Sequence, residues 1–121
     1  MTHPVTWFEV LGTDGEKLRK FYGDLFGWTF DVLPQINYGV ASTGDSRGIM
    51  GGIGPAYPGT KSWVTIYTET PDVTASLEKA RALGGTVVMP RTVLPGATVG
   101  VFEDPEGHTL GLVEARPAAA Q

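Results

Sequence analysis

The chain has 121 residues, which is enough for one domain with its own core, and its net charge of −4 disfavours binding to nucleic acid or anionic membranes. It contains no Cys, which excludes disulfides, thiol nucleophiles and thiolate metal sites and limits imidazole chemistry to His3 and His108. Its apolar runs are only strand-sized and its N-terminus has no signal-peptide pattern, so we expect a cytoplasmic protein.

The first half of the chain predicts a strand, a helix and three further strands. Residues 5–11 read as the first strand, and apolar side chains at helical spacing up to Phe26 predict the helix. Thr13 or Asp14 can cap the start of this helix, and Gly27 offers a left-handed stop at its end. The three further strands are expected at residues 28–33, 36–42 and 48–53.

The second half repeats this order. A segment rich in Gly and Pro, residues 54–61, reads as a linker, and neither it nor the loop at 91–96 has a predictable conformation. A second helix opens at Pro71 or Asp72 and ends at Gly84 and Gly85. Four strands are expected around it, at residues 62–68, 86–89, 97–103 and 109–113.

A shift of 58 positions aligns the two halves, placing Asp14 on Asp72 and Gly27 on Gly85. The sequence therefore predicts a single domain of two βαβββ modules. We expect the modules at about residues 5–53 and 62–115, with a tail at 116–121.

Charged residues of the two predicted helices are expected to face solvent. They are Glu16, Lys17, Arg19, Lys20, Glu78, Lys79 and Arg81. The pair Gly51 and Gly52, in the fourth strand, would allow a ligand to approach the backbone closely.

Two segments resemble the most recognisable parts of the vicinal oxygen chelate superfamily, which includes glyoxalase I, extradiol dioxygenases, fosfomycin-resistance enzymes and bleomycin-binding proteins. They are FYGDLFGWTF at residues 21–30 and DPEGHTLGLVE at residues 104–114, within a resemblance that covers about residues 5–115 in order. The resemblance implies an α+β fold in which paired βαβββ modules form curled mixed sheets. It also implies a homodimer.

The resemblance also locates the metal-ligand positions of the superfamily. Its metalloenzymes carry a ligand, often His, in the first strand, a His in the fifth and a Glu in the last, where this chain has Trp7, Thr65 and Gly111. An indole, a lone hydroxyl and a glycine cannot replace the His and carboxylate ligands. We therefore expect no metal and no other cofactor.

Strand alternation gathers aromatic and acidic side chains on the face that would line a cavity. The candidate ligand-binding residues are Trp7, Glu9, Trp63, Thr65, Tyr67 and Gly111. The rings suit a flat or cationic ligand, because stacking and cation–π contacts contribute about 0.5–2 kcal/mol each. The competing interpretation is that Trp7 fills the space of a lost metal site, while Trp63 and Tyr67 serve core or dimer packing.

Three functions remain open on this evidence. The first is a binding module that sequesters a small aromatic molecule, neutral or cationic, as bleomycin-resistance proteins do. The second is a metal-independent isomerase, lyase or hydrolase with Glu9 as the general base and Tyr67 or Thr65 orienting the substrate. The third is a non-catalytic interaction platform that keeps only the fold.

Overall fold

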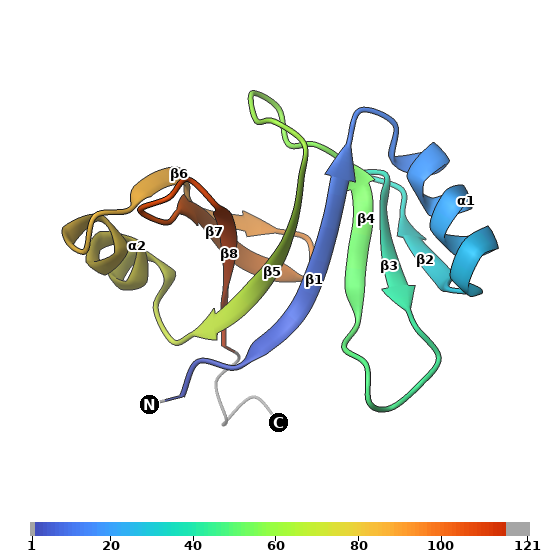
Figure 1. The fold of residues 1–121 in the computed structure, drawn as a ribbon, viewed down its shortest axis with the longest axis horizontal. Helices are drawn as coiled ribbons and strands as arrows, with labels where there is room; N and C mark the ends of the chain where they lie inside the picture. Colours follow the sequence, from blue (N-terminus) through green and yellow to red (C-terminus); the bar gives the residue numbers. More distant parts are fainter. Residues whose placement is uncertain (1, 116–121) are drawn as a thin grey trace. The chain divides into compact units, whose positions relative to one another are not determined.

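A computed structural model describes residues 2–115 of the chain. Figure 1 shows how the strands and helices follow one another. Their bounds are β1 (Val5–Gly12), α1 (Gly15–Phe26), β2 (Thr29–Leu33), β3 (Tyr38–Ser42), β4 (Gly51–Pro55), β5 (Trp63–Thr70), α2 (Val73–Ala82), β6 (Thr86–Leu94), β7 (Ala97–Glu103) and β8 (Thr109–Glu114). The described residues divide into two compact units, residues 6–65 and residues 2–5 with 66–115.

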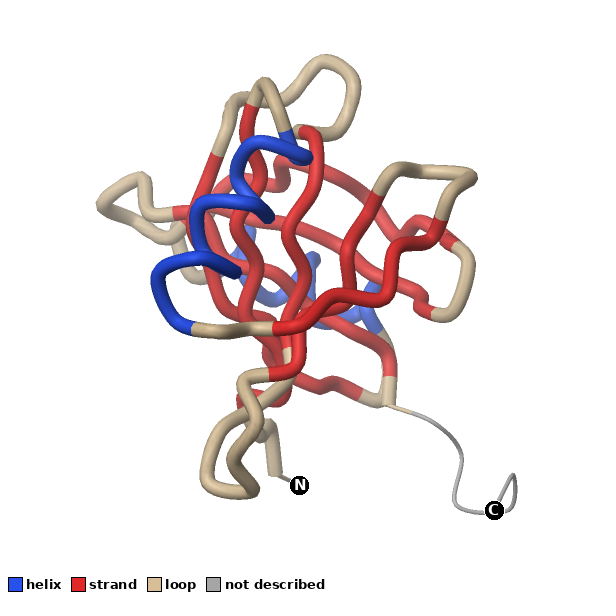
Figure 2. Tube along the Cα trace, turned by 90° about the vertical axis from the view of Figure 1, so that its right-hand side faces the viewer, coloured by secondary structure: helices blue, strands red, loops and turns tan. Residues whose placement is uncertain are grey.

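The first unit is a four-stranded mixed sheet with one helix on it. Its strand order is β2-β3-β4-β1, in which β1 and β4 are parallel and the other pairs are antiparallel. The helix α1 packs against β4 and β2, and Figure 2 shows it lying over the strands. Asp14 caps α1 by accepting a hydrogen bond from the Lys17 amide at 3.0 Å, and Gly27 ends it with a φ of 75°. Both ends of this helix are therefore as predicted.

The second unit repeats the arrangement. Its strand order is β5-β8-β7-β6, again with one parallel pair, β5 with β8, and antiparallel pairs elsewhere. Asp72 caps α2 through the Ala75 amide at 3.0 Å, and the helix buries Val73 and Leu77 against Leu112 of β8. The predicted α+β class with paired βαβββ modules is thus confirmed. The predicted tail at 116–121 lies outside the described residues.

The sixth strand is longer than predicted. The sequence predicted a strand at 86–89 and a loop at 91–96, whereas β6 pairs with β7 as far as Leu94 and the turn lies at Pro95 and Gly96. Two register irregularities, on either side of Met89, let the strand continue past Pro90. A proline inside a strand is tolerated at such bulges, which explains the difference.

The prediction that Arg19 faces solvent is wrong. This residue is 9% exposed, and its guanidinium donates to the Asn37 carbonyl at 2.9 Å, the Ile53 carbonyl at 3.2 Å and the Asn37 Oδ1 atom at 2.8 Å. Gly39 makes room for it, because a Cβ there would collide with the Arg19 Cδ atom. The buried charge is tolerated because its donors meet acceptors.

Within residues 2–115, neither helix has the length and apolar character needed to cross a membrane.

Candidate functional site

The centre of the candidate site is the carboxylate of Glu9 on β1, whose side chain is only 2% exposed. Its Oε2 atom accepts a hydrogen bond from the Tyr38 hydroxyl at 2.7 Å, and its Oε1 atom accepts one from the Trp63 indole N–H at 2.9 Å. A buried carboxylate needs such donors, because its desolvation is otherwise too costly. Glu9 therefore orients two aromatic side chains.

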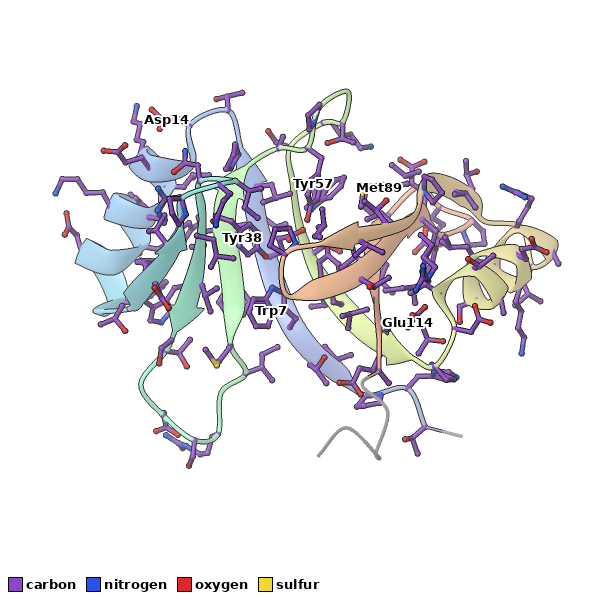
Figure 3. All side chains as sticks on the ribbon, turned by 180° about the vertical axis from the view of Figure 1, so that it is seen from behind. Trp7, Asp14, Tyr38, Tyr57, Met89 and Glu114 are labelled. Carbon is purple, nitrogen blue, oxygen red and sulfur yellow. The ribbon has the colours of Figure 1, made fainter. Side chains whose placement is uncertain are left out.

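Tyr38 extends this arrangement to a third ring. Its hydroxyl oxygen accepts a hydrogen bond from the Trp7 indole N–H at 3.0 Å, and Figure 3 shows these two side chains side by side on β3 and β1. We call Trp7, Glu9, Tyr38 and Trp63 the Glu9 network. A further ring, that of Tyr57, lies against Trp63 with centroids 5.8 Å apart. Two hydrogen bonds to the Glu9 carboxylate and one to the Tyr38 hydroxyl thus link aromatic side chains from three strands.

Two glycines of β4 make room for rings of neighbouring strands, one of them in the network. Gly52 lies opposite Glu9 in the parallel pairing of β1 and β4, and a Cβ on it would collide with the Tyr38 ring and hydroxyl. A Cβ on Gly51 would likewise collide with the Phe8 ring. The sequence suggested that these glycines admit a ligand, whereas in the structure they admit rings of the chain itself.

The Tyr38 hydroxyl is held in its protonated form. Burial first, and the nearby charge of Glu9 second, raise the pKa of Tyr38 well above its ordinary value. The phenol consequently remains a hydrogen-bond donor to Glu9 throughout the neutral pH range.

The remaining candidate residues divide between the two units. Thr65 is 6% exposed and shares the buried side of β5 with Trp63, since the intervening Val64 is 75% exposed. In the second unit, Tyr67 lies opposite Gly111 in the pairing of β5 with β8, and a Cβ on Gly111 would collide with the Tyr67 ring. The structure thus joins Trp63 to Glu9 by a direct hydrogen bond and Trp7 to Glu9 through Tyr38. It separately pairs Tyr67 with Gly111.

The three positions that resemble metal-ligand positions do not fit a metal ion. The Trp7 nitrogen is an N–H donor already directed at Tyr38, Thr65 offers one hydroxyl, and the space beside Gly111 holds the Tyr67 ring. In the described part of the chain, no group of three or more His, Cys, Asp or Glu side chains is placed to hold an ion. These three positions therefore supply no ligand set for a metal ion.

Sequence reasoning missed Tyr38 and Tyr57. A signal for Tyr38 was present, because a buried carboxylate on β1 requires donors from neighbouring strands. The pattern of β3 alone does not reveal that Tyr38 is this donor, since 29 residues separate it from Glu9.

Curated proteins similar to this chain include two that are about twice its length. "Putative glyoxylase CFP32" of Mycobacterium tuberculosis is 33% identical over 117 residues, which cover 90% of this chain and 44% of that protein. "Anthracycline biosynthesis protein DnrV" of Streptomyces peucetius is 30% identical over an alignment of 123 positions including gaps, and the alignment covers 88% of this chain and 45% of that protein. The chain thus spans less than half the length of these relatives.

Solved structures and a family model complete the comparison. The crystal structure of methylmalonyl-CoA epimerase from Mycobacterium tuberculosis has the same fold, with a TM-score of 0.62 at 14% identity over 96% of this chain and 90% of that chain. The family model for the Glyoxalase/Bleomycin resistance protein/Dioxygenase superfamily matches residues 5–112. The chain belongs to the glyoxalase, bleomycin resistance protein and dioxygenase superfamily.

Proposed function

We propose that the protein binds a small, flat aromatic molecule, neutral or cationic, against the Glu9 network and holds it without chemical change. The observation that carries this proposal is the hydrogen-bonded series from Trp7 through Tyr38 and Glu9 to Trp63. Trp7 and Tyr38 are only half-buried, so part of their surface stays accessible for contact.

The network supports binding because it fixes its rings before a ligand arrives. Immobilising a side chain on binding costs about 0.5–1.5 kcal/mol, and this cost is smaller for rings that hydrogen bonds already hold. Each stacking or cation–π contact with such a ring contributes about 0.5–2 kcal/mol. Two or three such rings together contribute about 1–6 kcal/mol, which corresponds to a Kd no tighter than about 40 μM.

The name of one relative also supports an aromatic ligand. DnrV is described as an anthracycline biosynthesis protein, and anthracyclines are flat, polycyclic aromatic compounds. The likeness extends over 88% of this chain at 30% identity.

The enzyme hypothesis has less support from the same geometry. A general base needs an oxygen directed at the proton that it removes. Both oxygens of Glu9 instead accept hydrogen bonds from side chains of the protein, and the carboxylate is almost fully buried. The geometry of Glu9 therefore favours a role in orienting rings over a role in proton transfer.

The proposal is tested with proflavine, a flat cation, followed through the polarisation of its emission. We expect saturable binding to the wild type, and Trp7→Ala should weaken it by about 1–3 kcal/mol, the scale for loss of an aromatic anchor. Trp7→Phe keeps a ring but removes the N–H, and it should also weaken binding. Trp28→Phe is the matched control, because Trp28 packs against Phe8 and Phe26 and not within the Glu9 network.

Thermal melting of each variant separates lost binding from lost folding. If Trp7→Phe binds proflavine like the wild type but melts at a lower temperature, Trp7 only fills the core and the proposal is wrong. Mass spectrometry of molecules that co-purify with the protein adds a second test, since a bound product with altered bonds would favour an enzyme.

We further propose that the chain forms a homodimer. The α1 residues Phe21, Leu25 and Phe26 are each 57–58% exposed, which is unusual for side chains of this size. A second copy would cover such apolar surface, and two copies would match the length of the relatives. Light scattering at micromolar concentration should give twice the chain mass, and a stable monomer would contradict the proposal.

A further inference from the structure

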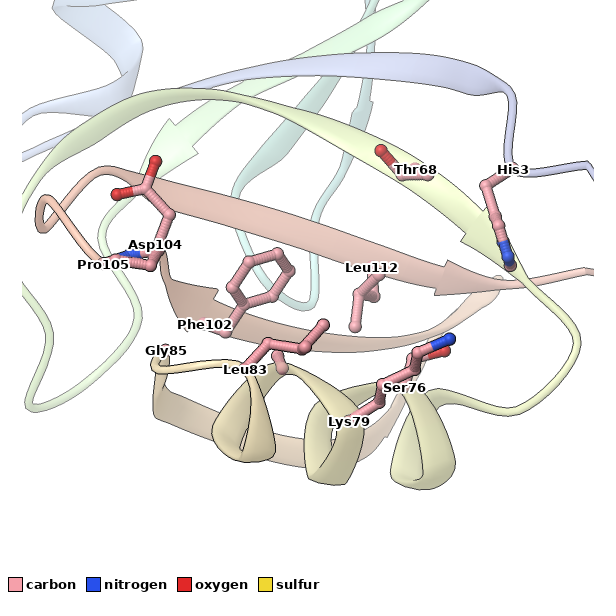
Figure 4. A pocket seen from close by; sticks show the side chains of 11 residues that line it. His3, Thr68, Ser76, Lys79, Leu83, Gly85, Phe102, Asp104, Pro105 and Leu112 are labelled. Atoms are coloured by element: carbon pink, nitrogen blue, oxygen red, sulfur yellow. The ribbon is translucent and has the colours of Figure 1, made fainter.

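The second unit contains a pocket of about 330 Å³ between α2 and the strands β7 and β8. Figure 4 shows Phe102 and Leu112 of the sheet facing Leu83 at the end of the helix. The volume lies at the lower end of the range for small-molecule sites, about 300–1,000 Å³.

Comparison of the two modules explains why this space is open. In the first unit the Tyr22 ring stacks on Trp28 at 5.8 Å, and the Phe26 ring lies 5.1 Å from Trp28. The 58-residue shift that aligns the modules places Ala80 at the position of Tyr22, Gly84 at that of Phe26 and Thr86 at that of Trp28. Of these three residues Ala80 lines the pocket, so the second module has a methyl group there where the first has the Tyr22 ring.

The polar groups around the pocket are unevenly distributed. His3 and Ser76 lie toward one end, and Lys79 follows Ser76 by one helical turn. The Lys79 ammonium group makes no hydrogen bond or ion pair with any other described residue. The Nδ1 atom of His3 is hydrogen-bonded to the Glu69 carbonyl at 3.0 Å, so the Nε2 atom is the ring nitrogen that could meet a ligand.

The carboxylate of Asp104 lies at the opposite end of the pocket, and hydrogen bonds within the protein already stabilise its negative charge. Asp104 accepts hydrogen bonds from the Glu106 and His108 amides at 2.9 and 3.0 Å, and its second oxygen pairs with the His108 ring at 3.0 Å. An anionic ligand would therefore turn its charge away from Asp104 and toward Lys79.

We propose that this pocket binds a small aromatic carboxylate, and that it is a site separate from the Glu9 network. The ring of the ligand occupies the space that the Tyr22 ring fills in the first module, against Phe102 and Leu112. Its carboxylate lies beside Lys79. The proposal does not depend on the function proposed above, because no residue of the pocket belongs to the Glu9 network.

The test uses 2-naphthoate as the probe and 2-naphthalenemethanol as its neutral counterpart, with the methyl resonances of Ala80, Leu83 and Leu112 followed by NMR. We expect saturable shifts of these methyl groups in the wild type. Ala80→Phe restores a ring at the position of Tyr22 and should weaken 2-naphthoate binding at least tenfold. The matched control is Ala82→Phe, because Ala82 is exposed and does not line the pocket.

Lys79→Met tests the charge without filling the pocket, and the exposed position leaves folding intact. It should weaken 2-naphthoate binding about two- to fivefold, the range of an exposed ion pair, and leave 2-naphthalenemethanol unchanged. Trp7→Phe should leave the shifts that both probes cause in the methyl groups of Leu83 and Leu112 unchanged, which distinguishes this site from the Glu9 network. The proposal is overturned if the wild type shows no saturable methyl shifts, or if Ala80→Phe binds 2-naphthoate as well as Ala82→Phe does.

Discussion

Replacing Tyr38 by phenylalanine removes one oxygen atom that takes part in two hydrogen bonds of the Glu9 network. The hydroxyl donates to Glu9 at 2.7 Å and accepts from the Trp7 indole at 3.0 Å. The ring itself can stay above Gly52. The substitution therefore tests whether the hydrogen bonds, and not only the ring packing, stabilise the site.

The expected loss follows from the burial of the two partners. A hydrogen bond to a charged group contributes about 1.5–3 kcal/mol, and one between neutral groups about 0.5–1.5 kcal/mol. Water can replace the lost partner of Trp7, which is half-buried, but cannot reach the Glu9 carboxylate, which is 2% exposed. We expect Tyr38→Phe to lower the unfolding free energy by about 2–4 kcal/mol. At about 4 °C per kcal/mol for a domain of this size, the melting temperature should fall by about 8–16 °C.

Urea unfolding at pH 7 measures this change, with Tyr22→Phe as the matched control. The Tyr22 ring packs against Phe21, Phe26 and Trp28, but its hydroxyl has no hydrogen-bond partner among the described residues. Its loss should change the unfolding free energy by less than about 0.5 kcal/mol. Equal effects of the two substitutions would refute the argument that Tyr38 satisfies Glu9.

The dependence of stability on alkaline pH is a second test of the Tyr38 hydroxyl. The pKa of Tyr38 is higher in the folded state than its unfolded value of about 10, so its contribution to stability is full below pH 10 and declines as pH rises further. Above pH 10, the unfolding free energy of the wild type should fall by about 1.4 kcal/mol more per pH unit than that of Tyr38→Phe. Denaturant unfolding at several pH values measures this difference. Parallel pH dependence of the two proteins would contradict the raised pKa.

Three further predictions concern Arg19, Glu114 and metal content. Arg19→Met leaves three oxygens without their donor, one of them the buried Ile53 carbonyl, and should lower the unfolding free energy by about 1–3 kcal/mol. Arg81→Met, on an exposed position, should change it by less than about 0.5 kcal/mol, and equal effects would contradict the burial of Arg19. Hydrogen bonds from Arg91, and then from the start of α2, lower the pKa of Glu114 to about 2. The wild type should therefore be more stable than Glu114→Gln at neutral pH, and acid titration should show this advantage disappearing between about pH 4.5 and pH 2; an advantage independent of pH would exclude this cause. Elemental analysis of protein purified without chelator should find no stoichiometric zinc, nickel, manganese or iron, and a value near one metal per chain would contradict the ligand argument.

Features that depend on neighbouring residues could be predicted from the sequence. The start of α1 at Asp14 and its end at Gly27 rest on contacts within four residues, and both were predicted. The longer β6 could not be predicted, because the bulges that let it pass Pro90 depend on its pairing with β7.

The site depends on contacts between distant segments. Trp63 lies 54 residues from Glu9, and nothing in either strand alone shows that the indole meets the carboxylate. The burial of Arg19 could not be predicted for the same reason. The helical pattern predicts that a charged residue faces solvent, whereas acceptors on the distant residues Asn37 and Ile53 hold Arg19 inside. Strand alternation could place Trp7 and Glu9 on one face, but only the arrangement of β1, β3 and β5 shows how their side chains are satisfied.

The most direct test of the Glu9 network as a ligand site is an NMR titration of the three tryptophan indole N–H groups with proflavine. Trp7 and Trp63 donate within the network, whereas Trp28 packs between Phe8 and the rings of α1 and serves as an internal control. We predict saturable shifts of the Trp7 and Trp63 resonances while the Trp28 resonance stays in place. Unchanged Trp7 and Trp63 resonances, or a largest shift at Trp28, would contradict the account.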